Sequence, residues 1–129
     1  MLFHGHSYTA NPLGCAAGIA SLEVFEMENT FAKIEHIGKL HAAFAQQLSA
    51  SAKVKNVAQC GTILRFELVS GQATGYMNNL RDKTYQYFIQ HKVILRPLGN
   101  VIYILPPYCI TDSELQKVYN AITGFLKEI

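Results

Sequence analysis

A loop near the start of the chain brings a glycine and two hydroxyl side chains to the start of a predicted helix. Ser7 and Thr9 come shortly before Asn11-Pro12, which indicates a helix start because asparagine caps helices and proline suits their first turn. Backbone N–H groups and the helix dipole favour an anion at such a position, so the loop could bind a phosphate. The alternative is that both hydroxyls only satisfy N–H groups of the first helical turn.

Arg96 is the second candidate for a binding role. It follows an apolar run at residues 93–95 and precedes Pro97, so we expect a stiff backbone and buried neighbours. A guanidinium can hold a carboxylate through two parallel hydrogen bonds, which a lysine cannot reproduce. A salt bridge to an acid of the chain itself is the alternative. Tyr103, on the next apolar run, could point to the same region.

Other reactive side chains give weaker signals. The segment around Ser7 lacks the second glycine and the preceding strand of a hydrolase nucleophile elbow. His4 and His6 could bind a metal, but the other histidines lie on predicted helices without a pattern of cysteines or carboxylates, so no metal site is predicted. The cysteines are odd in number and widely spaced, which favours structural thiols in a reducing, cytoplasmic setting. They are Cys15, Cys60 and Cys109.

Length and composition predict a single domain. The sequence has 129 residues, 50% of them hydrophobic, which is enough for one core and too short for two. Its formal net charge of +2 argues against nucleic acid as the main partner. No apolar run reaches the roughly 20 residues of a membrane span, and the first residues lack the basic and apolar regions of a signal peptide. The protein is therefore expected to be soluble and untargeted, with no membrane as a partner.

Hydrophobic periodicity predicts the order helix, helix, strand, helix, hairpin, helix. Helices are expected over residues 13–27, 31–48 and 77–91, and a last helix after a capping box at residues 111–114. A strand broken at Gly61 is expected over residues 54–69, and a hairpin is expected from residues 93–95 and 101–105. Glu67 alternates with apolar neighbours, as on a solvated strand face. The predicted class is α+β, a small antiparallel or mixed sheet covered by helices on one side.

Two segments resemble known aminotransferases. Residues 4–13, His-Gly-His-Ser-Tyr-Thr-Ala-Asn-Pro-Leu, resemble the loop that follows the active-site lysine in the class III aminotransferases. Residues 96–108, Arg-Pro-Leu-Gly-Asn-Val-Ile-Tyr-Ile-Leu-Pro-Pro-Tyr, resemble the C-terminal hairpin of the diaminopelargonic acid aminotransferases within that family. The resemblance implies one domain over residues 1–129, the C-terminal small domain of a fold type I aminotransferase. Residues 1–12 would be a loop for cofactor and partner subunit, and the large catalytic domain would be absent.

The resemblance also implies residue roles in a homodimer. His6 and Ser7 would bind the phosphate of pyridoxal 5'-phosphate in the neighbouring subunit, although many members carry proline or glycine in place of His6 and threonine in place of Ser7. Gly5, Arg96 and Tyr103 would contact the substrate 8-amino-7-oxononanoate, with Arg96 on its carboxylate. None of the eight lysines of the chain suits the role of the family's Schiff-base lysine, which belongs to the large domain. No catalytic residue and no activity of the isolated chain are therefore expected.

The expected function is a part of the enzyme that converts 8-amino-7-oxononanoate to 7,8-diaminononanoate in biotin biosynthesis. The alternative is a non-catalytic interaction module that docks on a large-domain partner or associates with itself, for which a large exposed apolar patch would be the mark.

Overall fold

The computed structural model describes Gly5 and residues 8–71 and 80–129. Within these residues the chain forms the elements α1 (Pro12–Met27), α2 (Thr30–Ser49), β1 (Val54–Cys60), β2 (Ile63–Leu68), α3 (Leu80–Gln90), β3 (Val101–Ile104) and α4 (Asp112–Glu128). Helices and a three-stranded antiparallel sheet in the order β1-β2-β3 confirm the predicted α+β class. The segment before Leu80, where the third helix was expected to begin, lies outside the described residues.

The sheet is built around β2, which pairs with β1 on one side and with β3 on the other. The turn between β1 and β2 uses Gly61 at a φ of 55°, a conformation that glycine adopts without a steric penalty. Leu64, Phe66 and Leu68 alternate along β2 and are each 0% exposed. These side chains therefore form the centre of the core.

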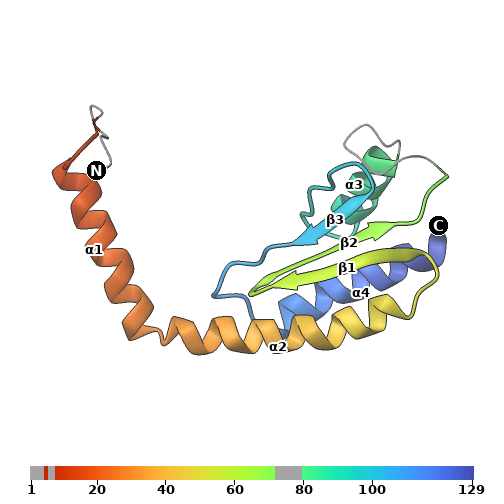
Figure 1. Cartoon of the computed structure of the whole chain (residues 1–129), viewed down its shortest axis with the longest axis horizontal. Helices are drawn as coiled ribbons and strands as arrows, with labels where there is room; N and C mark the ends of the chain where they lie inside the picture. The colour runs from red at the N-terminus through yellow and green to blue at the C-terminus, as the bar shows by residue number, and fades with distance from the viewer. Residues whose placement is uncertain (1–4, 6–7, 72–79) are drawn as a thin grey trace.

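Helices α2 and α4 lie along one face of the sheet (Figure 1). From α4, Leu115, Ile122 and Phe125 reach the core and are at most 1% exposed. Helix α3 joins them through Phe88, whose ring centroid lies 5.6 Å from that of Phe125. Burial of these apolar surfaces supplies the main stabilisation of the fold, and the predicted covering of the sheet by helices is confirmed.

The helix boundaries follow the predicted caps. Gly14 donates its backbone N–H to the Asn11 side chain at 3.1 Å at the start of α1. At the start of α4, Thr111 and Glu114 form the predicted capping box, with the Thr111 N–H donating to Glu114 Oε2 at 2.9 Å. Hydrogen bonds from the backbone and side chain of Thr111 lower the pKa of Glu114. Asn29, in the left-handed conformation at a φ of 49°, separates α1 from α2.

The predicted hairpin is wrong in its first strand. Residues 93–95 form no strand, and within the described ranges the only pairing on that side of β3 is an isolated bridge between Leu98 and Val101. Pro97 has no backbone N–H to donate to a β-ladder and restricts the conformation of the residue before it. Strand pairing therefore does not continue from Leu98 back towards residues 93–95.

The solvated position predicted for Glu67 is also wrong. Glu67 is only 9% exposed and lies 3.8 Å from Arg65 and 3.9 Å from Lys55.

Helix α1 projects away from the rest of the chain (Figure 1). None of its residues is buried, and the apolar side chains of Leu13, Ile19, Leu22 and Met27 are between 59% and 82% exposed. The ring of Phe25 contacts two other aromatic rings, and its centroid lies 5.8 Å from that of Phe31 and 5.8 Å from that of Tyr108. An apolar helix exposed to this extent indicates a docking surface for another part of a protein.

A buried histidine ties three elements together. His41 of α2 is 0% exposed; its Nε2 lies 3.0 Å from the carbonyl oxygen of Thr62, and its Nδ1 lies 2.7 Å from the hydroxyl of Tyr119 on α4. A carbonyl can only accept, so Nε2 carries the proton and Nδ1 accepts from Tyr119. Burial lowers the pKa of His41, and the hydrogen bond to Thr62 opposes that shift only in part.

This histidine makes the stability of the chain dependent on pH. Because the pKa of His41 is lower in the folded chain than its ordinary value of 6.5, the unfolded chain binds the proton more readily. The free energy of unfolding should therefore be highest above that ordinary value and fall as the pH is lowered from it towards the folded pKa. Thermal unfolding followed by circular dichroism, at pH of about 8 and about 5.5, measures this fall.

The variant His41→Gln should show a smaller fall than the wild type. His36→Gln, at an exposed histidine that lies 2.8 Å from Asp112, is the control and should not reduce it. Equal falls in the wild type and in His41→Gln would show that another group is responsible.

Candidate functional site

The N-terminal loop is described only in part. His6 and Ser7, the predicted phosphate-binding pair, lie outside the described residues, so their role stays a prediction. Gly5 is exposed, and a Cβ atom placed on it would meet no other residue within 4 Å. The first turn of α1 is capped by Asn11. Of the predicted site residues of this loop, only Gly5 is described, and it has open space around it. The described residues that follow from Tyr8 lead to the N-terminus of a helix whose dipole favours an anion.

Arg96 lies in a hollow that α3 and the segment after it form together. The Arg96 hollow has a volume of about 320 Å³ and is lined by Arg81, Asp82, Tyr85, Ile94, Arg96 and Pro97. Among the described residues, none forms a hydrogen bond or an ion pair with Arg96. The alternative of an internal salt bridge is therefore not found in this part of the chain, and the guanidinium is available to a carboxylate from outside.

Sequence reasoning missed the contribution of α3 to this hollow. Arg81 and Tyr85 are four residues apart and so lie on one face of the helix, a signal that the sequence does contain. The sequence does not show, however, that this face of α3 lies beside Arg96. That placement depends on the packing of Phe88 against Phe125, which is a tertiary contact.

Tyr103 is not brought into the Arg96 hollow. It is half-buried in β3, directly opposite Arg65 of β2, and is not among the described residues that line the hollow. Its neighbours in the strand, Ile102 and Ile104, point into the core. The predicted contact of Tyr103 with substrate therefore stays a prediction.

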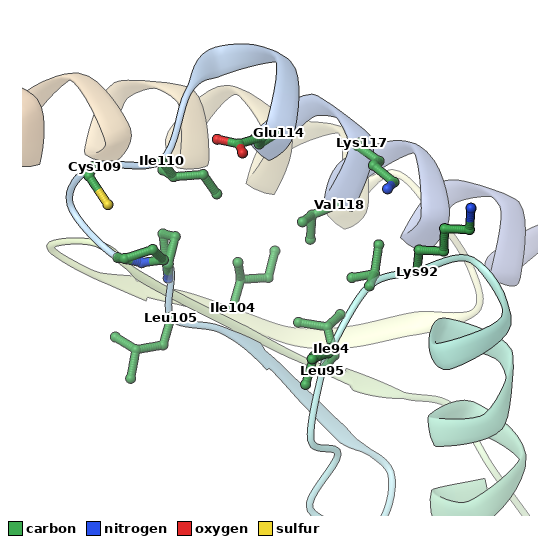
Figure 2. Close-up of a pocket in the computed structure, with 13 residues that line it drawn as sticks. Lys92, Ile94, Leu95, Ile104, Leu105, Cys109, Ile110, Glu114, Lys117 and Val118 are labelled. Carbon is green, nitrogen blue, oxygen red and sulfur yellow. The ribbon is translucent and has the colours of Figure 1, made fainter.

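A larger hollow lies between α4, the end of β3 and the segment after α3 (Figure 2). Its volume is about 470 Å³, and apolar side chains such as Ile94, Leu105 and Val118 form most of its lining. Among its lining residues the charged ones are Lys92, Lys117 and Glu114, and Glu114 already accepts hydrogen bonds in the cap of α4. The hollow thus has the character of a packing surface rather than of a reaction centre.

The remaining reactive residues lie outside the Arg96 hollow. Within the described part of the chain, no group of three histidine, cysteine or acidic side chains could hold a metal ion. His36 pairs with Asp112, and Nδ1 of His91 lies 2.8 Å from the carbonyl oxygen of Tyr87. All three cysteines are exposed and unpaired. None of the helices in the described ranges is long and apolar enough to cross a membrane.

The lysines do not provide a nucleophile. Seven of the eight are exposed and Lys33, the other, is partly buried and lies 2.6 Å from Glu28. A lysine that forms a covalent bond with a carbonyl compound needs a desolvated site or a cationic neighbour that lowers its pKa. The arrangement can bind and orient anions, but the described residues contain no group placed for covalent chemistry.

Comparisons with known proteins give a consistent result. A family model described as aminotransferase class-III matches residues 1–126. The adenosylmethionine-8-amino-7-oxononanoate aminotransferase of Synechococcus elongatus is 44% identical over 127 residues, and the enzyme of that name from Geobacter sulfurreducens is 38% identical over 133 residues. These matches cover 98% and 95% of this chain and 29% of each relative, so the chain spans less than a third of their length.

Solved structures are similar over the same extent. The adenosylmethionine-8-amino-7-oxononanoate aminotransferase of Methanocaldococcus jannaschii superimposes with a TM-score of 0.85 at 32% identity, covering 99% of this chain and 30% of that one. A transaminase solved with L-ala gives a TM-score of 0.86 at 21% identity, covering 99% of this chain and 31% of that one. The second likeness concerns the fold alone.

Proposed function

This chain belongs to the class-III aminotransferase family, and from that premise we propose that it is the C-terminal small domain of an enzyme that converts 8-amino-7-oxononanoate to 7,8-diaminononanoate. The family depends on pyridoxal phosphate. The observation that carries the proposal is Arg96, an exposed guanidinium without a partner among the described residues, in a chain whose named relatives match it almost end to end.

The residues of the chain would bind and orient rather than react. When bound, pyridoxal phosphate supplies an electron sink for amino transfer. His6 and Ser7 would hold its phosphate in the neighbouring subunit, and the N-terminus of α1 would add a favourable dipole. Ser7 would supply a hydroxyl, and the open space at Gly5 leaves room for a phosphate, so the groups that the chain offers are compatible with the cofactor.

Substrate binding would depend mainly on Arg96. Its fork can donate hydrogen bonds to both oxygens of a carboxylate, which fixes the far end of the substrate and so the position of its reacting carbon. Gly5 would leave room beside the substrate, and Tyr103 would contact it from the sheet. A carboxylate held at one end of a long chain is the feature that distinguishes this substrate from a simple amine.

The exposed face of α1 supports a larger assembly. Leu13, Ile19, Leu22 and Met27 are mostly accessible in this chain, and burying one such side chain contributes about 1.5–3 kcal/mol. We propose that the large domain or a second subunit covers them. The second candidate function, a non-catalytic interaction module, rests on this same observation and lacks any role for Arg96.

Substitution on α1 tests the docking surface. Leu22→Gln should change the free energy of unfolding of this chain by less than about 0.5 kcal/mol, because Leu22 is 69% exposed. The same change should weaken association with the large domain by about tenfold, measured by isothermal titration calorimetry, because apolar burial is lost. Glu23→Gln on the next position is the matched control. Equal association by both variants would contradict docking of the large domain on this surface.

Substitution of Arg96 tests the proposed activity. In the intact enzyme, Arg96→Ala should raise KM for 8-amino-7-oxononanoate by about tenfold to a hundredfold, because a charged hydrogen-bonded pair is lost, and should change kcat much less. The KM of Arg96→Lys should lie between those of the wild type and Arg96→Ala, since lysine keeps the charge but not the planar fork. Steady-state kinetics give both constants. A wild-type enzyme that transfers no amino group to this acid, or unchanged kinetics in Arg96→Ala, would refute the proposal.

A further inference from the structure

One turn of α3 faces the arginine that the proposed function uses. Arg81 and Tyr85 lie on the same side of the helix, Asp82 follows Arg81, and all three line the Arg96 hollow. The opposite wall is formed by Ile94, Arg96 and Pro97. Side chains from two segments of the chain thus meet around one small volume.

The charges in this hollow do not cancel. Two arginines and one aspartate line it, so its formal charge is +1. The aspartate is engaged by its neighbour rather than by Arg96, since Arg81 Nη1 lies 3.3 Å from Asp82 Oδ1. The side chains of this pair are 41% and 87% exposed, and exposed ion pairs of this kind are weak enough to be exchanged for another partner. Arg81 also has an interaction within the chain beyond this pair. A carboxylate that enters the hollow would therefore meet the guanidinium of Arg96, the guanidinium of Arg81 with its own partners, and one competing carboxylate.

We infer that Arg81 and Asp82 set the affinity and the specificity of the enzyme for the carboxylate end of its substrate, with Arg81 as a second cation beside Arg96 and Asp82 as the opposing charge. The inference rests on the proposed function and adds two specificity-determining residues on α3. The substrate class is an acid whose carboxylate stands at the end of an apolar chain. Ile94, which is 84% exposed, offers that chain an apolar wall.

Substitutions at these two positions should leave the fold intact. Helix α3 is anchored by Thr84 and Phe88, which are both 0% exposed, whereas Arg81 and Asp82 lie at the surface. Changes in substrate affinity can therefore be separated from changes in stability. Lys83, the next residue of α3, is exposed and does not line the hollow, so it provides a matched control.

The test measures KM and kcat of the intact enzyme with 8-amino-7-oxononanoate. Arg81→Gln should raise KM by about threefold to tenfold and leave kcat within about twofold, because a partly exposed attractive charge is removed. Asp82→Asn should lower KM by about twofold to threefold, because a repulsive charge is removed. Lys83→Gln should change neither constant. With the primary amide of the same substrate, which has no carboxylate charge, the effects at Arg81 and Asp82 should disappear.

Three results would overturn the inference. They are equal KM values in Arg81→Gln and Lys83→Gln, a higher KM in Asp82→Asn, and effects of the same size on the acid and on its amide. Each leaves the proposed function standing as long as the wild-type enzyme transfers amino groups to the acid and Arg96→Ala raises KM. If the wild-type enzyme does not act on the acid at all, the proposed function fails and the inference fails with it.

Discussion

The burial of one face of β2 holds the rest of the structure in place. Leu64, Phe66 and Leu68 are fully enclosed between the sheet and its helices, and β2 is the strand that pairs with both neighbours. Because the core is closely packed, each helix has one position on this face. The packing that places α3 beside α4 through Phe88 also places the first turns of α3 beside Arg96. The candidate binding hollow is thus a consequence of the core.

Much of this fold could be predicted from local signals. The periodicity of α2 and α4, the capping box at Thr111 and the turn at Gly61 all depend on neighbours in the sequence, and all are confirmed. The absent strand at residues 93–95 and the buried position of Glu67 depend on tertiary contacts and were predicted wrongly. The candidate site likewise has one part that local sequence predicts and one part that depends on tertiary contacts. Arg96 could be selected as a candidate from its charge and its place before Pro97, whereas its position beside the first turns of α3 could not be predicted.

The chain has binding groups but is incomplete as a reaction centre. Its lysines are solvated and its apolar helix α1 lacks a covering layer among the described residues, and both features agree with a chain that spans about 29% of its curated relatives. Arg96 is the converse case, a charge near a buried core with no internal partner in the described ranges. An uncovered apolar helix is unfavourable alone, whereas an exposed guanidinium is hydrated. A further domain would cover the helix, and a substrate carboxylate would bind the guanidinium.

The near-visible absorbance of this chain after incubation with pyridoxal phosphate and removal of the free cofactor tests the central claim most directly. It is measured for the chain alone and for the chain copurified with the large domain of a class-III aminotransferase. The account predicts a protein-bound cofactor band, and amino transfer to 8-amino-7-oxononanoate, only in the paired sample. A stable band from the chain alone, or a purified pair with neither band nor activity, would contradict it.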